Sequence, residues 1–125
     1  MRHFKRGTIM DQVDIEEFFA PIGPVRVRSM FGGKGIYADG RIIALEVNGD
    51  LLLKADADSA PRFAEAGATQ WVYAGRPGRK SVAMPYWSVP EDALDDLDAR
   101  VEWLGLAIEA AERSERAKRR RPPRR

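Results

Sequence analysis

Two stretches of the chain combine glycine and lysine in a way that suggests a phosphate-binding loop. The first is FGGKGIYADGRIIALEVNGDLLLK (residues 31–54), and the second is GRPGRKS (residues 75–81). A Walker-type loop needs a glycine and a lysine followed by Ser or Thr, and it leads directly into a helix whose N-terminal amides hold the phosphates. Lys34 is followed by glycine instead of a hydroxyl residue, and Arg79 stands where the second stretch needs glycine. We therefore expect neither stretch to bind a nucleotide.

The other residue types that could support catalysis lack partners in the sequence. His3 is the only histidine, so a histidine base or metal site has no second histidine beside it. The acidic run 91–98 could be read as a metal or acid–base cluster, but carboxylates at the start of a helix complement its dipole, and we prefer that interpretation. Ser29 and Ser81 have no base at a recognisable spacing, and the chain contains no cysteine. The sequence thus predicts no enzyme, cofactor or metal site.

Length and composition describe one globular domain. The 125 residues are 44% apolar and 32% charged, which is typical of a folded protein with a modest core. No run approaches the roughly 18–20 apolar residues of a membrane span, and the basic start MRHFKRGTIMDQ lacks the apolar segment of a secretory signal. We therefore expect a cytoplasmic protein without membrane contact, with Met10 as a second candidate start of translation.

The net charge of +2 conceals a division along the chain. Residues 113–125, RSERAKRRRPPRR, hold eight Arg or Lys and one Glu, a local balance of +7. The other 112 residues hold thirteen Arg or Lys against eighteen Asp or Glu, a balance of −5. An acidic body therefore carries a basic tail. Because Pro122-Pro123 cannot continue a helix and the tail has little apolar content, we expect residues 113–125 to be largely disordered.

The first glycine-rich stretch is better explained as a series of β-strands. Asp39-Gly40 separates GIYA from RIIALEV, and Asn48-Gly49 separates RIIALEV from DLLLK. Both dipeptides tolerate the positive φ angles of tight hairpin turns, and apolar strand sequence flanks each of them. Gly32-Gly33 is predicted to turn the chain after an earlier strand, VRVRSMF (25–31). These signals predict an antiparallel meander.

Further elements flank the meander. Residues 11–20 carry apolar side chains at helical spacing, with Asp11 as a candidate cap. Asp58 and Ser59 are candidate caps of a short helix that ends near Gly67. TQWVYA (69–74) and KSVAMPYW (80–87) read as two strands joined by a basic turn, and residues 88–120 read as helical.

The resulting order predicts the fold class. Helix, four strands, helix, two strands and helix indicate an α+β domain with an antiparallel sheet of five or six strands, a meander plus a hairpin. The N-terminal, middle and C-terminal helices are expected to pack on this sheet. For the last helix, Ser88 and Glu91 have capping-box spacing. Its apolar residues at steps of three and four predict the buried stripe, which consists of Leu94, Leu97, Val101, Leu104, Ile108 and Ala111.

Aromatic and basic side chains leave two interpretations open. Six aromatic residues could form a stacking platform for single-stranded nucleic acid, although in a domain of this size most of them are expected to fill the core. They are Tyr37, Trp71, Tyr73, Tyr86, Trp87 and Trp103. Arg26, Arg28 and Arg41 could share one sheet face that binds phosphate or an acidic partner. A solvated strand face opposite acids such as Glu46 explains these arginines equally well.

Taken in order, the motifs resemble a known family. The run RSMFGGKGIYADGRIIALEVNGDLLLKAD is similar to the N-terminal domain of the TfoX/Sxy family, regulators of natural competence for DNA uptake, and the resemblance spans about residues 11–112. The residues that carry it are Arg28, Met30, Phe31, Gly32, Gly33, Gly35, Tyr37, Gly40 and Lys54, followed by Phe63, Gly67, Tyr86, Pro90 and Trp103. The resemblance implies an α+β fold and a regulatory role without catalysis. Full-length members carry a second, helical domain, whereas this chain has only a basic tail after its last helix.

These observations lead to one functional expectation and one alternative. We expect a non-catalytic regulatory protein that acts through a protein partner, such as the transcription machinery, with a homodimer as an open possibility. The alternative is non-specific nucleic-acid binding by the tail, because flexible cationic side chains contact mainly phosphates. Its candidate contacts are Arg116, Lys118, Arg119, Arg120, Arg121, Arg124 and Arg125. The expected organisation is a flexible leader (1–10), a TfoX N-terminal-like domain (11–112) and the tail (113–125).

Overall fold

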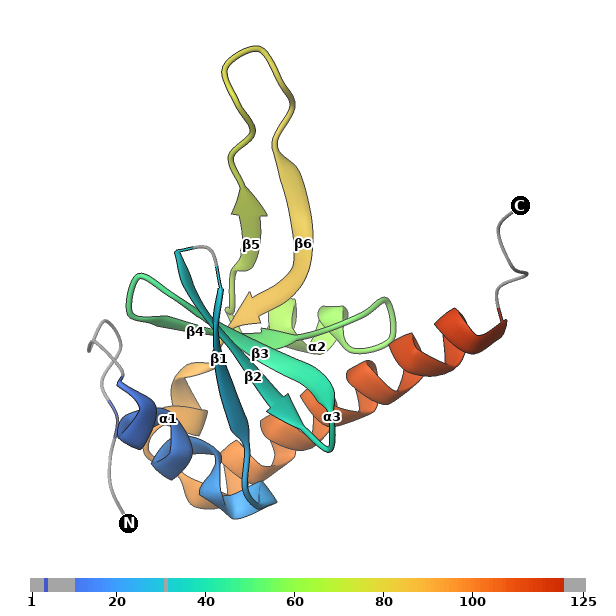
Figure 1. Cartoon of the computed structure of the whole chain (residues 1–125). Helices are drawn as coiled ribbons and strands as arrows, with labels where there is room; N and C mark the ends of the chain where they lie inside the picture. The colour runs from blue at the N-terminus through green and yellow to red at the C-terminus, as the bar shows by residue number, and fades with distance from the viewer. Residues whose placement is uncertain (1–3, 5–10, 31, 121–125) are drawn as a thin grey trace.

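The computed structural model describes residues 4, 11–30 and 32–120 of the chain, and it has the expected α+β architecture (Figure 1). Helices and strands follow one another as helix, four strands, helix, two strands and helix, with two short 3-10 helices between them. Their bounds are α1 (Gln12–Phe19), η1 (Ala20–Ile22), β1 (Arg26–Met30), β2 (Gly33–Ala38), β3 (Arg41–Val47), β4 (Asp50–Lys54), α2 (Ala60–Glu65), β5 (Gln70–Tyr73), β6 (Val82–Ser88), η2 (Glu91–Leu94) and α3 (Leu97–Arg120).

The six strands form one antiparallel sheet in the order β1-β2-β3-β4-β6-β5. The first four strands are the predicted meander. The hairpin of β5 and β6 joins the sheet through β6, which pairs with β4, so β5 becomes the outer strand. Only the lower part of β6 pairs with β4, from Tyr86 to Ser88, and the rest of the hairpin rises away from the sheet (Figure 1).

The turns between the meander strands have the predicted geometry. Asp39 and Gly40 have φ angles of 50° and 77°, and Asn48 and Gly49 have φ angles of 52° and 88°. Two consecutive residues with positive φ are typical of the two-residue turns whose twist matches that of the flanking strands. The turn dipeptides in the sequence therefore set the strand register, which places directly paired residues on the same face of the sheet.

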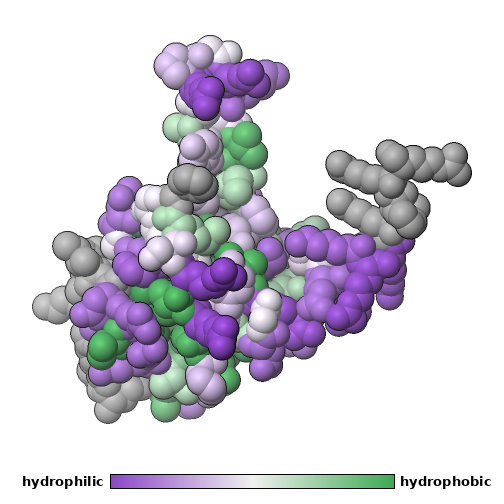
Figure 2. Space-filling model, viewed as in Figure 1, coloured by the Kyte–Doolittle hydropathy of each residue, from purple (hydrophilic) through white to green (hydrophobic). Residues whose placement is uncertain are grey.

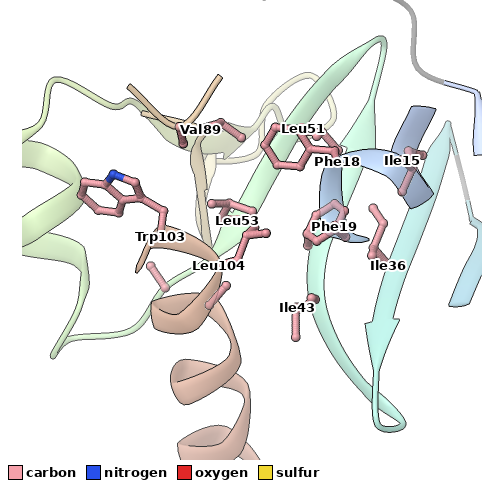
Figure 3. Close-up of a cluster of buried hydrophobic side chains, with 14 of the residues drawn as sticks. Ile15, Phe18, Phe19, Ile36, Ile43, Leu51, Leu53, Val89, Trp103 and Leu104 are labelled. Atoms are coloured by element: carbon pink, nitrogen blue, oxygen red, sulfur yellow. The ribbon is translucent and has the colours of Figure 1, made fainter. Parts of the chain in front are cut away.

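Helix α1 begins where the sequence predicts. The Asp11 side chain accepts a hydrogen bond from the Asp14 backbone N–H at 2.9 Å, and the Asp14 side chain accepts one from the Asp11 N–H. This reciprocal capping box satisfies backbone donors that the first turn leaves without partners. The helix then places Ile15, Phe18 and Phe19, all fully buried, against Ile36 of β2 and other sheet residues (Figure 3).

The cap of α2 differs from the expectation. Ser59 precedes the helix, but its side chain makes no capping bond to the helix. The Asp56 carboxylate instead stabilises the turn before the helix, since its Oδ1 accepts the backbone N–H groups of Asp58 and Ser59 at 3.1 Å each. The reason is the turn at residues 57–59, which brings both donors to the Asp56 carboxylate.

The start of the last helix is also later than predicted. Ser88 is the last residue of β6, and its Oγ accepts the Thr69 backbone N–H at 2.9 Å, so it forms no capping box with Glu91. A separate turn, η2, lies between the strand and α3. The side chain of Asp96 accepts the Ala99 N–H at 3.1 Å and so caps the helix one residue before its first turn.

The buried stripe of α3 is rotated relative to the predicted stripe. Leu97 and Val101 are each 43% exposed, whereas Leu104 is fully buried as expected. The buried side chains are instead Arg100, Trp103, Leu104, Ala107, Ala110 and Ala111. The sequence pattern of leucine and valine was misleading because Arg100 turns inward, where its guanidinium finds backbone acceptors in η2. Figure 3 shows Leu104 beside Leu53 of β4.

Only two of the three arginines that could share a sheet face, Arg26 and Arg28, lie on the same face. Arg26 pairs with Tyr37, which puts it on the same face as that tyrosine, and Arg28 pairs with Gly35 on that face too. Arg41 pairs with Ala38 and so lies on the opposite face, where it forms an ion pair with Glu115 of α3. Glu46 does not oppose Arg28 either.

Glu46 is buried, and its side chain takes part in the hydrogen bonding of the β3–β4 turn. It lies 6% exposed opposite Lys34, with 3.6 Å between Oε2 and Nζ, and its Oε1 accepts the Gly49 backbone N–H at 3.0 Å. The carboxylate therefore fixes the β3–β4 turn and is not a cross-strand partner for the arginines of β1.

The structure describes few residues at the two ends of the chain, so the expectations for these ends are tested only in part. Phe4, within the predicted flexible leader, is 7% exposed, and its backbone N–H donates to the Leu94 carbonyl at 3.1 Å. At the other end, residues 113–120 form the last turns of α3, so the expected disorder is wrong for them. His3, the rest of the leader and residues 121–125 lie outside the described residues, and the proposed domain limits stay a prediction. No helix in the described ranges combines the length and apolar character needed to cross a membrane.

Candidate functional site

A cationic pocket lies where the C-terminal half of α3 passes the end of the sheet. Its volume is about 450 Å³. One wall comes from the β2–β3 turn and the adjoining strands, and the other comes from α3 (Figure 1). The residues that line it are Tyr37, Asp39, Gly40, Arg41, Ile42, Lys54, Ala111, Ser114, Glu115 and Lys118. Three of these, Tyr37, Gly40 and Lys54, are positions that carry the family resemblance.

Lys54, the last residue of β4, is partly buried in this wall. Its Nζ lies 5.2 Å from the centre of the Tyr86 ring, which gives the ammonium a cation–π contact. Burial lowers the pKa of Lys54 below its usual value, the positive charge of Lys118 lowers it further, and Asp56 acts in the opposite direction. Among the described residues, neither Lys54 nor Lys118 takes part in a salt bridge within 4 Å.

The residues on either side of Ser114 in α3 form ion pairs with the sheet and with the segment that follows β4. The Arg113 guanidinium donates to both oxygens of Asp56, at 2.6 and 3.0 Å, and lies 3.4 Å from Asp58. The hydrogen bond from Arg113 lowers the pKa of Asp56, and the same bond raises the pKa of Arg113. On the other side, Glu115 accepts from Arg41. This bond lowers the pKa of Glu115.

A second surface feature is the hairpin of β5 and β6, which we call the arm (residues 70–88). Val72, Tyr73 and Val82 are each more than half exposed on it, and the connecting loop carries Arg76, Arg79 and Lys80. Figure 2 shows hydrophobic residues along the stem and strongly hydrophilic residues at the tip. Residues 66–90 contain no Asp or Glu, so all the charge that the arm carries is positive. The glycine–lysine stretch 75–81 is thus a hairpin loop, as predicted.

The predicted nucleic-acid contacts that the structure describes lie on the last two turns of α3. Arg116, Lys118, Arg119 and Arg120 are all exposed, although Arg119 also contacts Glu115 on its own helix. The far end of α3 is hydrophilic in Figure 2. The other three, Arg121, Arg124 and Arg125, lie outside the described residues.

The motif residues have mainly structural roles apart from those at the pocket. A Cβ on Gly35 would lie 2.7 Å from the Met30 sulfur and 3.1 Å from the Tyr37 ring, so glycine leaves room for those side chains over the sheet. The Arg28 guanidinium lies 5.9 Å from the centre of the same ring. Gly32 turns the chain with a φ of 69°, Gly33 begins β2, and Phe31 lies outside the described residues.

The aromatic residues do not form the stacking platform that was considered as an alternative to core packing. Trp103 and Tyr86 are buried, and the Trp103 ring lies against Phe63 with 4.8 Å between ring centres. Trp71 and Tyr73 meet edge to face on the arm, 6.2 Å apart, away from the sheet. The aromatic residues thus contribute mostly to the core, and Tyr73 is the one exposed large aromatic side chain among the described residues.

The motif series and the fold agree with a comparison against known protein families, in which residues 17–111 match the TfoX N-terminal domain. The chain belongs to the TfoX N-terminal domain family. No curated protein matches it. The matched range ends at Ala111, so the TfoX domain contributes the sheet wall of the pocket, and Ser114, Glu115 and Lys118 of the other wall lie just beyond it.

Within the described part of this TfoX domain and its helix, no three His, Cys, Asp or Glu side chains gather in a way that could hold a metal ion. Sequence reasoning identified Lys54 only as a motif position and missed the contacts of Arg41, Asp56 and Glu115. No local signal could have revealed them, because Arg113 and Asp56 are 57 residues apart and Arg41 and Glu115 are 74 apart.

Proposed function

We propose that this member of the TfoX N-terminal domain family is a non-catalytic regulatory protein that binds a protein partner through the arm. The observation that carries the proposal is the exposure of Val72, Tyr73 and Val82, at 52%, 57% and 54%, on a projecting hairpin. Large apolar side chains that are exposed to solvent do not stabilise the core. When several of them cluster on one part of the surface, they are typical of a protein interface.

The charge of the arm indicates the chemistry of the partner. Arg76, Arg79 and Lys80 surround the apolar stem at its tip, and no acidic residue lies between positions 66 and 90. A complementary surface is apolar at its centre and acidic at its rim, since opposite potentials steer association and favour the correct partner. The resemblance to competence regulators supports a role in transcriptional regulation, and the cytoplasmic location expected from the sequence fits this role.

The proposal is tested by affinity capture of partners from native cytoplasm with and without nuclease treatment. The arm variant Val72→Ser/Tyr73→Ser/Val82→Ser should lose the partner retained by the wild type after nuclease, because it removes apolar contact area. The matched control is Val13→Ser/Val101→Ser, which changes apolar residues that are 60% and 43% exposed on α1 and α3. Equal capture by the arm variant and the control would reject the proposal, provided that both variants unfold at the wild-type denaturant concentration.

A second function, non-specific nucleic-acid binding, is favoured by the exposed basic residues at the end of α3. Arg116 and Arg120 make no ion pair with another described residue within 4 Å, so they are available to phosphates. With roughly four to six phosphate contacts, the logarithm of affinity should fall against that of salt concentration with a slope of about −3 to −5.

Fluorescence anisotropy on labelled duplexes tests this second function. Cutting the chain after Glu112 would also remove Arg113 and Glu115, which hold the helix to the sheet, so a better comparison is Arg116→Gln/Arg120→Gln in the full chain. This variant should weaken binding and reduce the salt slope by about two. Unchanged binding would exclude the helix end as the contact surface.

A further inference from the structure

The pocket beside α3 has cationic and hydrogen-bonding groups on both of its walls. Lys54 and Arg41 come from the sheet, and Lys118 comes from the helix. Tyr37 and Ser114, whose side chains carry hydroxyl groups, are also among the residues that line this space. Residues that are 64 positions apart in the sequence, Lys54 and Lys118, thus face one pocket, and nothing in the local sequence requires this arrangement.

The positive charges in the pocket are not fully balanced by the protein. Glu115 already accepts from Arg41 and from Arg119, and Asp39 stands at the exposed β2–β3 turn. Within the described part of the chain, Lys54 and Lys118 have no carboxylate within 4 Å. Burial of the Lys54 ammonium is unfavourable, the repulsion between the two lysines adds to the cost, and the charge of Asp56 offsets this cost only in part. An anion between them would remove both penalties.

The walls of the pocket are held in place independently of a ligand. The Asp56–Arg113 and Arg41–Glu115 pairs fix the helix on two sides, so the lysines are not brought together by the ligand itself. Groups that are positioned beforehand lose little entropy on binding. Because Ile42 and Ala111 also line the space, one part of the pocket is apolar.

We propose that this pocket binds the phosphate group of a small phosphorylated molecule between Lys54 and Lys118. Phosphate oxygens accept from the ammonium groups and from the Tyr37 and Ser114 hydroxyls. The volume of about 450 Å³ exceeds that of phosphate alone and lies within the roughly 300–1,000 Å³ range of small-molecule sites, so the ligand carries an organic part against Ile42. This site is independent of the arm and of its protein partner.

Calorimetry and thermal unfolding with inorganic phosphate, adenosine 5′-monophosphate and adenosine test the proposal on the full chain, with NaCl at equal ionic strength as the reference. Both phosphate compounds should bind and raise the unfolding temperature, whereas adenosine should do neither. Lys54→Met and Lys118→Met should each weaken binding at least tenfold. The matched control Lys80→Met, in the exposed tip of the arm, should bind as the wild type does.

The two lysine variants also separate binding from folding. Lys54→Met replaces an unpaired, partly buried charge by an apolar chain of similar length, so it should fold at least as stably as the wild type without ligand. Lys118 is exposed on α3, and its variant carries the test if Lys54→Met unfolds. Binding by both variants within twofold of the wild type, or no wild-type binding at 10 mM phosphate, would overturn the proposal.

A nucleic-acid backbone could present the same phosphate chemistry, so a 20-base-pair duplex is measured in parallel. Duplex binding that depends on Lys54 while both small phosphates fail to bind would also overturn the small-molecule proposal. The arm variant Val72→Ser/Tyr73→Ser/Val82→Ser should bind phosphate normally. Loss of the protein partner and loss of phosphate binding are therefore distinguishable.

Discussion

Arg100 shows how a charged side chain is accommodated in this core. It is 2% exposed, and its Nε and Nη2 atoms donate to the carbonyl oxygens of Ala93 and Leu94, both at 2.8 Å. Its guanidinium also lies 4.9 and 4.6 Å from the ring centres of Phe4 and Phe18. Burial lowers the pKa of Arg100, and the charge of Asp95 opposes this effect. Two oriented carbonyls and two ring faces take the place of a buried carboxylate.

Replacing this arginine by lysine should therefore destabilise the protein although the charge is kept. A single ammonium cannot reproduce the two-pronged contact, and one buried carbonyl loses its donor, so Arg100→Lys should lower the free energy of unfolding by about 1–3 kcal/mol. The matched control is Arg62→Lys, because Arg62 is 50% exposed beside Glu102 and should change by less than about 0.5 kcal/mol. Equal denaturant midpoints for the two variants would show that the fork geometry is unimportant.

Two glycines with open space around them should respond to alanine in opposite directions. An added Cβ would meet no atom within 4 Å at Gly40 or at Gly105, but Gly40 has a φ of 77° and Gly105 lies within α3. Gly40→Ala should cost about 1 kcal/mol because an L side chain resists that φ, and Gly105→Ala should stabilise by about 0.5–1 kcal/mol. Chemical denaturation measures both, and changes of the same sign would contradict the assignment of backbone strain to the turn.

At the scale of elements, α3 determines how the sheet is covered. Its inward side combines three large side chains, Arg100, Trp103 and Leu104, with small alanines at positions 107, 110 and 111. The alanines at 107, 110 and 111 do not attract attention in a hydrophobicity pattern, yet each is at most 4% exposed. Close packing of these small side chains leaves few voids between α3 and the strands.

The rotated stripe leads to a paired prediction for neighbouring turns of α3. Leu104→Ala removes a fully buried side chain and should destabilise by roughly 2–5 kcal/mol through lost contacts and a cavity. Val101→Ala, at a position that is 43% exposed, should change stability by less than about 0.5 kcal/mol. If urea midpoints move by similar amounts in the two variants, both positions belong to the same buried stripe and the observed rotation is wrong.

At the scale of the whole molecule, charge is distributed unevenly over the fold. Acidic residues gather on α1, η2 and the start of α3, whereas the arm and the end of α3 are basic. The acidic residues of the body therefore do not surround the basic end of α3. Where α3 passes the end of the sheet, Arg41 pairs with Glu115, and Asp56 forms a bidentate pair with Arg113.

This pair should make stability depend on acid in a defined range. The pKa of Asp56 is lowered in the fold from its ordinary value of 3.8, so the pair contributes fully above that value and is lost as the pH falls through the lowered pKa. Asp56→Asn should be less stable than the wild type by about 1–2 kcal/mol at neutral pH, and the difference should shrink below about pH 4. Asn still accepts the α2 capping bonds, which isolates the charge.

Denaturant unfolding from pH 7 to pH 2 measures this difference, with Asp58→Asn as the control. Asp58 is 74% exposed and lies farther from Arg113, so its removal should have little effect at any pH. A difference between wild type and Asp56→Asn that persists undiminished at pH 2 would mean that the pair does not stabilise the fold through its charge.

Features that depend on neighbouring residues could be predicted from the sequence. Asp39-Gly40 and Asn48-Gly49 predicted two turns because few residues accept positive φ, and Asp11 predicted the start of α1 because its side chain reaches the next turn. These local rules were enough to predict the class of the fold, its strands and, through the motif series, its family.

The rotation of α3 and the contacts beside it depend on long-range packing and could not be predicted. Leu97 and Val101 are apolar whether they face the core or the solvent, so their residue type does not reveal their exposure. The inward position of Arg100 depends on carbonyl groups of η2 that α3 contacts only in the folded protein. Lys54 and Lys118 likewise share a pocket because strand order and helix direction bring them together. Contacts between residues so distant in the chain leave no periodic or local signal, since their energy appears only once the whole core is packed.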